Sequence, residues 1–230
     1  MYIVLERAKL NEFENRKSVN KRFRTIEYGL KRLSIMEKKL RKKNEHNWIR
    51  RYEKEIPGQM VHFDTKRLPL LWGETRIDKR EHLHVAIDDY SRYLIDDIFP
   101  DKGQYSSSIH LQEVIDSAPF PIEEVYSDNG SAYQGRKDHA FVEKCIKNSI
   151  SQRFTRPRTP RTNGKAERVI RTLMQEWHIN GTFNTREERR RSLQEYIYYY
   201  NFQRKHSGIK GLTPTQRITN YLSGQSVNND

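Results

Sequence analysis

The chain has 230 residues, with 43 Lys and Arg against 30 Asp and Glu, which gives a formal net charge of +13. Its single cysteine, Cys145, excludes an internal disulfide framework and a cysteine-rich zinc site. No apolar stretch approaches the roughly 18 residues that a membrane span requires, and the N-terminus lacks the apolar segment of a secretory signal. The 13 Tyr, 9 Phe and 3 Trp favour a folded core.

Residues 1–56 are basic and have a helical pattern. They hold 17 Lys and Arg against 8 acidic residues, and Ile26, Leu30 and Leu33 follow the i, i+4, i+7 spacing of an amphipathic helix. Such an excess of positive charge favours a polyanion as partner, because each phosphate that a Lys or Arg neutralises releases counterions. A solvated helix surface is an equal alternative. Pro57-Gly58 ends the pattern and predicts a domain boundary.

After Pro57 the periodicity is that of an α/β chain. Strands are expected within residues 59–68, 82–90, 91–99, 123–130 and 151–156. Helices are expected at 106–118, 138–149, 165–177 and 186–201, with Thr213 and Pro214 starting one more. The stretch 156–164 has too many Pro and Gly residues to be regular, and residues 218–230 are expected to form a flexible tail. This order of elements predicts a mixed sheet.

Three acidic residues occupy positions that suggest chemistry. Asp64 lies inside an apolar strand, where an unpaired acid is costly, and Asp128 follows a strand, where α/β proteins bind ligands. Glu167 flanks the apolar stripe of its helix, which consists of Ala166, Val169, Ile170, Leu173 and Trp177. Each acid also has an ordinary alternative role: Asp64 as a polar residue at the sheet edge, Asp128 as a turn former and Glu167 as a helix-surface residue. Together they could hold two Mg²⁺ or Mn²⁺ ions for an in-line phosphoryl displacement.

The segments around these acids resemble the catalytic core of bacterial insertion-sequence transposases. The stretches that carry the resemblance are QMVHFDTK, HLHVAIDDYSRYL, VYSDNGSAY, RTPRTNGKAERVIRTL and YYYNFQRKHSGIKGLTP, within residues 57–217. The resemblance implies a retroviral-integrase-type, ribonuclease-H-like core, with a mixed five-stranded sheet flanked by helices. Matched position by position, it implies a DDE triad of Asp64, Asp128 and Glu167 as catalytic residues and metal ligands.

The resemblance also implies a reaction and its partners. Such a transposase uses two Mg²⁺ or Mn²⁺ ions per active site to cleave the 3′ end of its element with water, and the freed 3′-hydroxyl then attacks target DNA. The implied partners are double-stranded DNA, as element ends and target, and further copies of the chain. The implied location is the cytoplasm, in association with the nucleoid.

A second basic cluster surrounds Glu167. The resemblance places Arg171 on the terminal DNA of the element, and neighbouring side chains are expected to assist. The full set of expected DNA contacts is Arg156, Arg158, Arg161, Asn163, Lys165, Arg168, Arg171 and Arg204. Asn163 is also expected to cap the helix that follows it. Asp89 is expected to form a turn with Ser91, with Arg92 as its partner, and to take no part in catalysis.

The chain departs from the family pattern in three places. Asp128 and Glu167 are further apart in sequence than is usual, and Met174 stands where many relatives have Lys or Arg. Residues 1–56 are shorter than the helix-turn-helix region of such transposases, so we expect a remnant of that region. Two other functions stay open. One is a plain ribonuclease-H-like endonuclease, and the other is a non-catalytic or weakly active DNA-binding remnant of a decayed transposase.

Overall fold

A computed structural model describes residues 53–75, 77–155 and 163–224 of the chain. Contacts between Cα atoms divide the chain into two units, residues 1–52 and 53–230. The first unit, which holds most of the predicted basic segment, lies outside the described residues. Within the described residues, no helix combines the length and the apolar character that are needed to cross a membrane.

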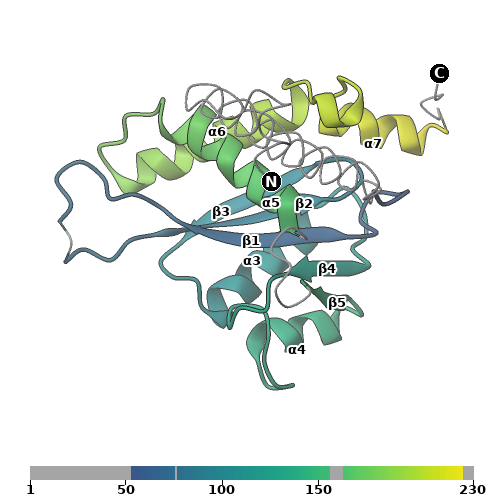
Figure 1. Cartoon of the computed structure of the whole chain (residues 1–230), viewed down its shortest axis with the longest axis horizontal. Coiled ribbons are helices and arrows are strands. Elements are labelled where there is room, and N and C mark those ends of the chain that lie inside the picture. Colours follow the sequence, from purple (N-terminus) through teal and green to yellow (C-terminus); the bar gives the residue numbers. More distant parts are fainter. Residues whose placement is uncertain (1–52, 76, 156–162, 225–230) are drawn as a thin grey trace, which may run out of the picture. The chain divides into compact units, whose positions relative to one another are not determined.

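The centre of the second unit is a mixed five-stranded sheet with the strand order β3-β2-β1-β4-β5 (Figure 1). The strands are β1 (Val61–Arg67), β2 (His82–Asp88), β3 (Leu94–Phe99), β4 (Glu124–Ser127) and β5 (Ser151–Phe154). β1 pairs antiparallel with β2 and parallel with β4, while β2–β3 is antiparallel and β4–β5 is parallel. This confirms the mixed sheet predicted from the order of elements.

Helices cover both faces of the sheet, as Figure 1 shows. They are α3 (Gln104–Ser117), α4 (Ala140–Lys147), α5 (Gly164–Thr172), the π-helical η2 (Leu173–His178), α6 (Arg186–Phe202), the 3₁₀ turn η3 (Ser207–Ile209) and α7 (Pro214–Leu222). Thr213 caps α7 with Pro214 at its start, as predicted. α7 ends at Leu222 with Ile218 buried, so it extends into the range where we expected a flexible tail.

Two hydrophobic cores lie on opposite faces of the sheet. The predicted stripe of α5 and η2 is buried in one core with β2, β3 and α6, and Val61 and Phe63 of β1 are buried in the other with α3 and α4. Successive strand residues point to opposite faces. His62 and Asp64, on either side of Phe63, therefore lie on the face that α5 covers.

Polar contacts hold α6 along the edge strand β3. The Asn201 side chain accepts from the Leu94 N–H at 2.9 Å and donates to the Leu94 carbonyl at 2.8 Å. Arg189, only 1% exposed, forms an ion pair with the buried Glu81 and donates to the Pro69 carbonyl at 2.9 Å. The Asn201 contacts satisfy the backbone groups of Leu94 at the edge of the sheet, and the Arg189 contacts fasten α6 to the segments that flank β1 and β2.

Candidate active site

Asp64 lies at the centre of the candidate site, half-buried on the α5 side of β1. Burial is the main cause that raises its pKa from 3.8 to about 6, and the carboxylates of Asp128 and Glu167 raise it further. The Thr65 N–H donates to Asp64 Oδ1 at 2.8 Å, and this hydrogen bond lowers the pKa of Asp64. Asp128 and Glu167 therefore both lie within electrostatic reach of Asp64.

Strand register brings Asp128 to Asp64. β1 and β4 run parallel with Val61 opposite Val125 and His62 opposite Tyr126, and the same register continued leads residue 64 to residue 128. Asp128 is exposed just beyond the end of β4. Its Oδ1 accepts from the Gly130 N–H at 2.9 Å. A Cβ at residue 130 would stand 2.8 Å from that oxygen, so the glycine lets the carboxylate take this position.

Glu167 reaches the site from the first turn of α5, where it is exposed. Ala166, Val169 and Ile170 are buried on the sheet side of this helix. At about 100° per residue, Glu167 stands at the border of that buried stripe. The packing of α5 on the sheet therefore carries the Glu167 carboxylate to within electrostatic reach of Asp64.

Tyr133 is a neighbour of the site that was missed from the sequence. It is 2% exposed, and burial together with the carboxylates of Asp64 and Asp128 raises the pKa of its hydroxyl well above the ordinary value. Two residues that are distant in sequence thus act on one phenol, which is independent evidence that Asp64 and Asp128 converge. The signal was present in the stretch VYSDNGSAY, of which Tyr133 is the last residue.

The donor chemistry of the three acids fits a hard divalent cation. Within residues 53–75, 77–155 and 163–224, no three His, Cys, Asp or Glu side chains are gathered closely enough to hold a metal ion. Asp64 and Asp128 each have one carboxylate oxygen bonded to a backbone N–H. Carboxylate oxygens are nonetheless the ligands that Mg²⁺ and Mn²⁺ prefer, and a cation here would offset the repulsion that raises the pKa of Asp64.

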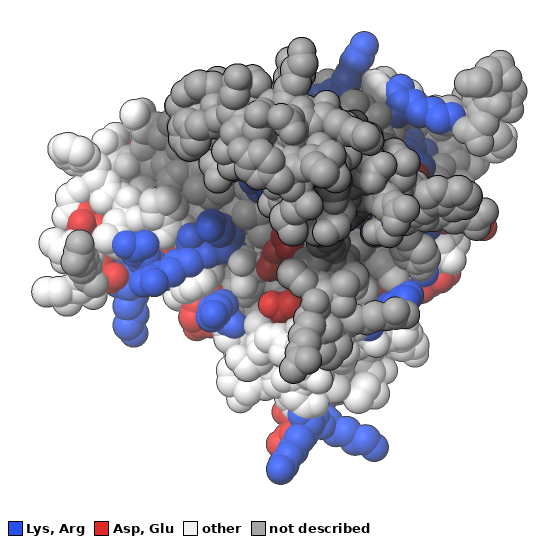
Figure 2. Space-filling view, viewed as in Figure 1, with Lys and Arg blue, Asp and Glu red and all other residues white. Residues whose placement is uncertain are grey.

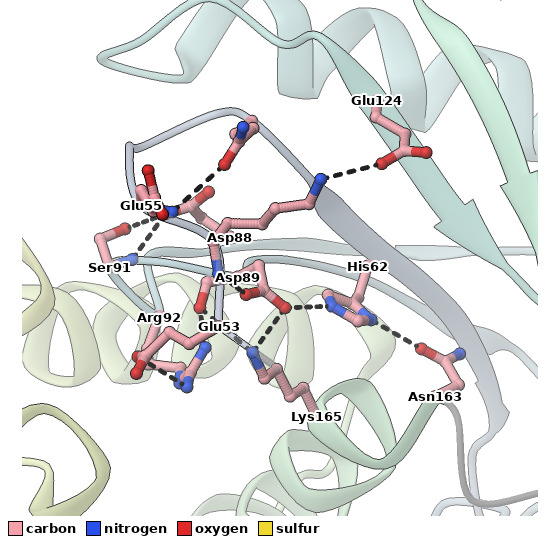
Figure 3. Close-up of polar contacts among 12 residues, drawn as sticks. Glu53, Glu55, His62, Asp88, Asp89, Ser91, Arg92, Glu124, Asn163 and Lys165 are labelled. Carbon is pink, nitrogen blue, oxygen red and sulfur yellow. Dashed lines mark hydrogen bonds and ion pairs between the residues drawn. The ribbon is translucent and has the colours of Figure 1, made fainter. Parts of the chain in front are cut away.

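A buried polar network surrounds Asp89 (Figure 3). Asp89 is 0% exposed, and its Oδ1 accepts from His62 Nε2 at 2.6 Å and from Lys165 Nζ at 2.5 Å. The Lys54 N–H donates to its Oδ2 at 2.7 Å. Burial alone would raise the pKa of Asp89, but the hydrogen bonds from His62 and Lys165 outweigh it and hold the pKa below its ordinary value. Asp89 is therefore a charged acceptor.

Asn163 joins the same network and is 4% exposed. Its side-chain nitrogen donates to the Phe63 carbonyl at 3.0 Å, and its Oδ1 lies 3.2 Å from His62 Nδ1. Asn163 does stand at the N-cap position of α5, but its side chain makes no capping hydrogen bond. The predicted cap is therefore wrong, because the amide is engaged with β1.

The turn after β2 contains the predicted residues in different roles. Asp88, rather than Asp89, accepts from the Ser91 N–H and hydroxyl, both at 2.6 Å, and from the Gly58 N–H at 2.8 Å. Arg92 has a left-handed φ of 65° and donates to the Asp89 carbonyl and to Glu53. The sequence signal Asp-Asp-x-Ser fits either acid, and only the fold decides which one faces the turn.

The other predicted DNA contacts fall into three groups. Arg168 and Arg171 are exposed on α5. Arg204 forms an ion pair with Glu176, and its Nε donates to that side chain at 2.8 Å. The positions outside the described residues are Arg156, Arg158 and Arg161. Met174, the departure from the family pattern, packs partly buried against the α5–α6 core.

A basic pocket that the sequence did not reveal lies at the end of β1, lined by strand residues on the face opposite to Asp64. It has a volume of about 520 Å³ and is lined by Thr65, Arg67, Ile77, Asp78, Lys79, Arg80, His82, Pro100 and Lys102. Arg67 and Lys102 both act on His82, whose pKa is lowered by burial first and by these charges second. Figure 2 shows Lys and Arg side chains gathered at the left of the drawn face, next to acidic side chains nearer its middle.

Sequence comparison connects the chain to mobile elements. The chain is 23% identical over 208 residues to the ORF3 protein of Spiroplasma virus SpV1-C74, which is named as a candidate integrase, covering 80% of this chain and 56% of that protein. It is 31% identical over 101 residues to an uncharacterized insertion element IS136 protein of Agrobacterium fabrum, covering 44% and 50%. The chain thus spans about half the length of these curated relatives.

Comparison with solved structures supports the fold. The catalytic core domain of BIV integrase matches with a TM-score of 0.55 and 18% identity, covering 73% of this chain and 98% of that domain. A chain of the simian T-cell lymphotropic virus intasome in complex with PP2A regulatory subunit B56 gamma matches with a TM-score of 0.61 and 17% identity, covering 73% and 56%. The sheet and helices therefore form a ribonuclease-H-like fold, as expected.

Two family profiles match overlapping parts of the chain, and both are described as integrase core domain. They match residues 54–160 and residues 148–214. Their combined range contains Asp64, Asp128 and Glu167 and every strand of the sheet. The chain therefore belongs to the integrase core domain family.

Proposed function

We propose that this protein is a DNA transposase, a polynucleotidyl transferase that cleaves the 3′ end of a mobile element and joins it to target DNA. Asp64, Asp128 and Glu167 are its catalytic acids and metal ligands. The observation that carries the proposal is the raised pKa of Asp64, to which the other two carboxylates contribute within an integrase-type fold. Like charges near a half-buried carboxylate disfavour its ionised form, and a bound cation would offset that effect.

Each acid is prepared for this role by its own surroundings. The Thr65 N–H orients Asp64, the Gly130 N–H orients Asp128, and the packing of α5 presents Glu167. Bound Mg²⁺ or Mn²⁺, two ions per site, would activate the attacking oxygen and stabilise the leaving one. The protein residues then need only to hold the cations and to align the phosphodiester, so no side-chain nucleophile is required.

The surroundings of the site favour DNA as the substrate. The basic pocket at the end of β1 presents Arg67, Lys79 and Arg80. Arg168 and Arg171 add exposed positive charge on α5. Phosphate contacts of this kind fix the register of a duplex without reading its sequence. The likeness to a chain of a viral intasome supports a multimer that joins DNA ends. The simplest location for this activity is the cytoplasm, in association with the nucleoid.

An oligonucleotide joining assay tests the proposal. Wild-type protein with Mg²⁺ should cleave a labelled element end and join it to a target duplex. Asp64→Asn should lose both steps and keep DNA binding within about twofold, because the substitution removes a metal ligand and no phosphate contact. The matched control is Asp116→Asn, the same chemical change at an exposed position on α3; it should leave both steps unchanged.

The assay also separates the alternatives. Cleavage without joining would identify a plain endonuclease, and binding without any Mg²⁺-dependent cleavage would identify a non-catalytic remnant. Each of these results contradicts the proposal. Full activity of Asp64→Asn would show instead that the catalytic residues are wrongly assigned.

A further inference from the structure

The structure assigns a positioning role to four residues that hold the catalytic helix against β1, three of them buried and the fourth, Lys165, partly exposed. We propose that His62, Asp89, Asn163 and Lys165, the Asp89 clamp, fix the first turn of α5 and thereby place Glu167 opposite Asp64. Asn163 and Lys165 then act inside the protein, where the sequence suggested contacts with DNA. The catalytic part of this inference rests on the proposed function.

One carboxylate oxygen joins three elements of the fold. Asp89 follows β2, His62 belongs to β1, and Lys165 belongs to the first turn of α5. Both His62 Nε2 and Lys165 Nζ bond to Asp89 Oδ1, at 2.6 and 2.5 Å (Figure 3). Because Asp89 is fully buried, these bonds form away from water and are stronger than surface ion pairs. The start of α5 is therefore fastened to the sheet through one acid.

Asn163 provides a second attachment, whose hydrogen-bond directions follow from chemistry. A backbone carbonyl can only accept, so the Asn163 nitrogen must face the Phe63 oxygen, 3.0 Å away. Its Oδ1 then faces His62 Nδ1 at 3.2 Å. On the other side of the ring, Nε2 faces Asp89 at 2.6 Å.

The clamp connects directly to the acids that it would position. The Phe63 carbonyl that Asn163 holds belongs to the residue before Asp64, and Asn163 lies one helical turn before Glu167. A shift of the first turn of α5 would therefore move Glu167 relative to Asp64. Misplacement of a reacting group by about 1 Å can cost about 100-fold in rate. Removal of one clamp member also leaves its buried partners unsatisfied.

Two substitutions with opposite charge changes separate positioning from DNA contact. Lys165→Gln removes a positive charge and Asp89→Asn removes a negative one. A clamp predicts the same result for both, a fall in kcat of roughly 100-fold with DNA affinity kept within about twofold. A DNA contact at Lys165 predicts weaker binding and a salt dependence reduced by about one charge, and it predicts no loss for Asp89→Asn. That result would overturn the clamp.

A double variant tests whether the two residues act together. Asp89→Asn with Lys165→Gln should lower kcat no further than Asp89→Asn alone, because the Asp89 change already disrupts the hydrogen bond that Lys165 makes. The matched controls are Asp116→Asn on α3 and Lys147→Gln, which removes an exposed ion pair with Glu143 on α4. Both controls should retain wild-type kcat. Losses that multiply in the double variant would show two independent effects and contradict the clamp.

Hydrogen exchange gives a readout that requires no catalytic activity. The amides of residues 168–171 bond to carbonyls of the first turn of α5, and in Lys165→Gln they should exchange about tenfold faster, with exchange in α3 unchanged. Lys165 is partly exposed, so this variant decides the question if Asp89→Asn fails to fold. Unchanged exchange and unchanged kcat would refute the clamp. If Asp64→Asn is inactive while Lys165→Gln keeps its activity, the proposed function is supported and the clamp is refuted. If the wild-type protein never cleaves DNA, the hydrogen-exchange result alone tests the clamp.

Discussion

Replacement of Asp64 by asparagine should stabilise the fold while abolishing activity. The ordinary pKa of this acid is 3.8 and its pKa in the fold is about 6, so ionisation of Asp64 costs the native state up to roughly 3 kcal/mol at 1.36 kcal/mol per unit. The folded-state pKa is the higher one, so the penalty is absent below about pH 4 and complete above about pH 6. Asparagine avoids the charge and can still accept from the Thr65 N–H.

Thermal melts in the presence of a chelator measure this effect. At pH 8, Asp64→Asn should melt about 5–10 °C above the wild type, and at pH 4 the two proteins should melt together. Added Mg²⁺ should raise the Tm of the wild type and leave that of Asp64→Asn unchanged, because only the wild type retains the full set of ligands. Equal melting at pH 8, or a gain that is the same at pH 4, would refute the argument that a crowded, half-buried carboxylate destabilises this fold.

Three further variants test separate parts of the structure. Gly130→Ala should lower strand transfer about tenfold or more with little change in Tm, because the new Cβ would stand 2.8 Å from Asp128 Oδ1 and displace that carboxylate; normal kinetics would contradict this. Arg189→Ala should cost about 3–5 kcal/mol in urea unfolding, since it leaves Glu81 buried without its partner, and a loss below 1 kcal/mol would count against it. Lys79→Gln in the basic pocket should weaken DNA binding uniformly across sequences and reduce the salt slope by about one charge, whereas an unchanged slope would remove the pocket from the DNA-binding surface.

The fold, and the elements that carry the three acids, could be predicted because they depend on local periodicity. The apolar strand around Asp64, the strand end before Asp128 and the stripe beside Glu167 are each visible within a few residues of sequence. Parallel pairing of β1 with β4 then brings the first two acids together. Their roles as catalytic residues and metal ligands remain proposals, since these require a bound ion and a reaction.

The Asp89 clamp could not be predicted, because its contacts span long distances in the sequence. Lys165 and Asp89 are 76 positions apart, and Asn163 and His62 are 101 apart. In the sequence, Lys165 stands in an arginine-rich stretch and resembles its neighbours, and only the packing of α5 turns it inward. Periodicity cannot distinguish an outward from an inward polar side chain at the border of a stripe.

The helix predicted at 165–177 was also only partly right. The structure divides it into α5 and the π-helical η2, which begins at Leu173. A change from α to π hydrogen bonding leaves the apolar stripe nearly intact, so the hydrophobic pattern carries no sign of it. The basic pocket could not be predicted either, because its charged residues come from three segments that are separate in the sequence, around Arg67, Lys79 and Lys102.

The most direct test of the central claim is the location of Mn²⁺ by anomalous diffraction from crystals of the protein. We expect Mn²⁺ bound between the carboxylates of Asp64 and Asp128, with Glu167 completing the site at oxygen–metal distances of about 2.0–2.3 Å. The Mn²⁺ density should disappear in Asp64→Asn. Mn²⁺ bound elsewhere, or no bound Mn²⁺ in a protein that still joins DNA, would contradict the claim that these three acids form the catalytic metal site.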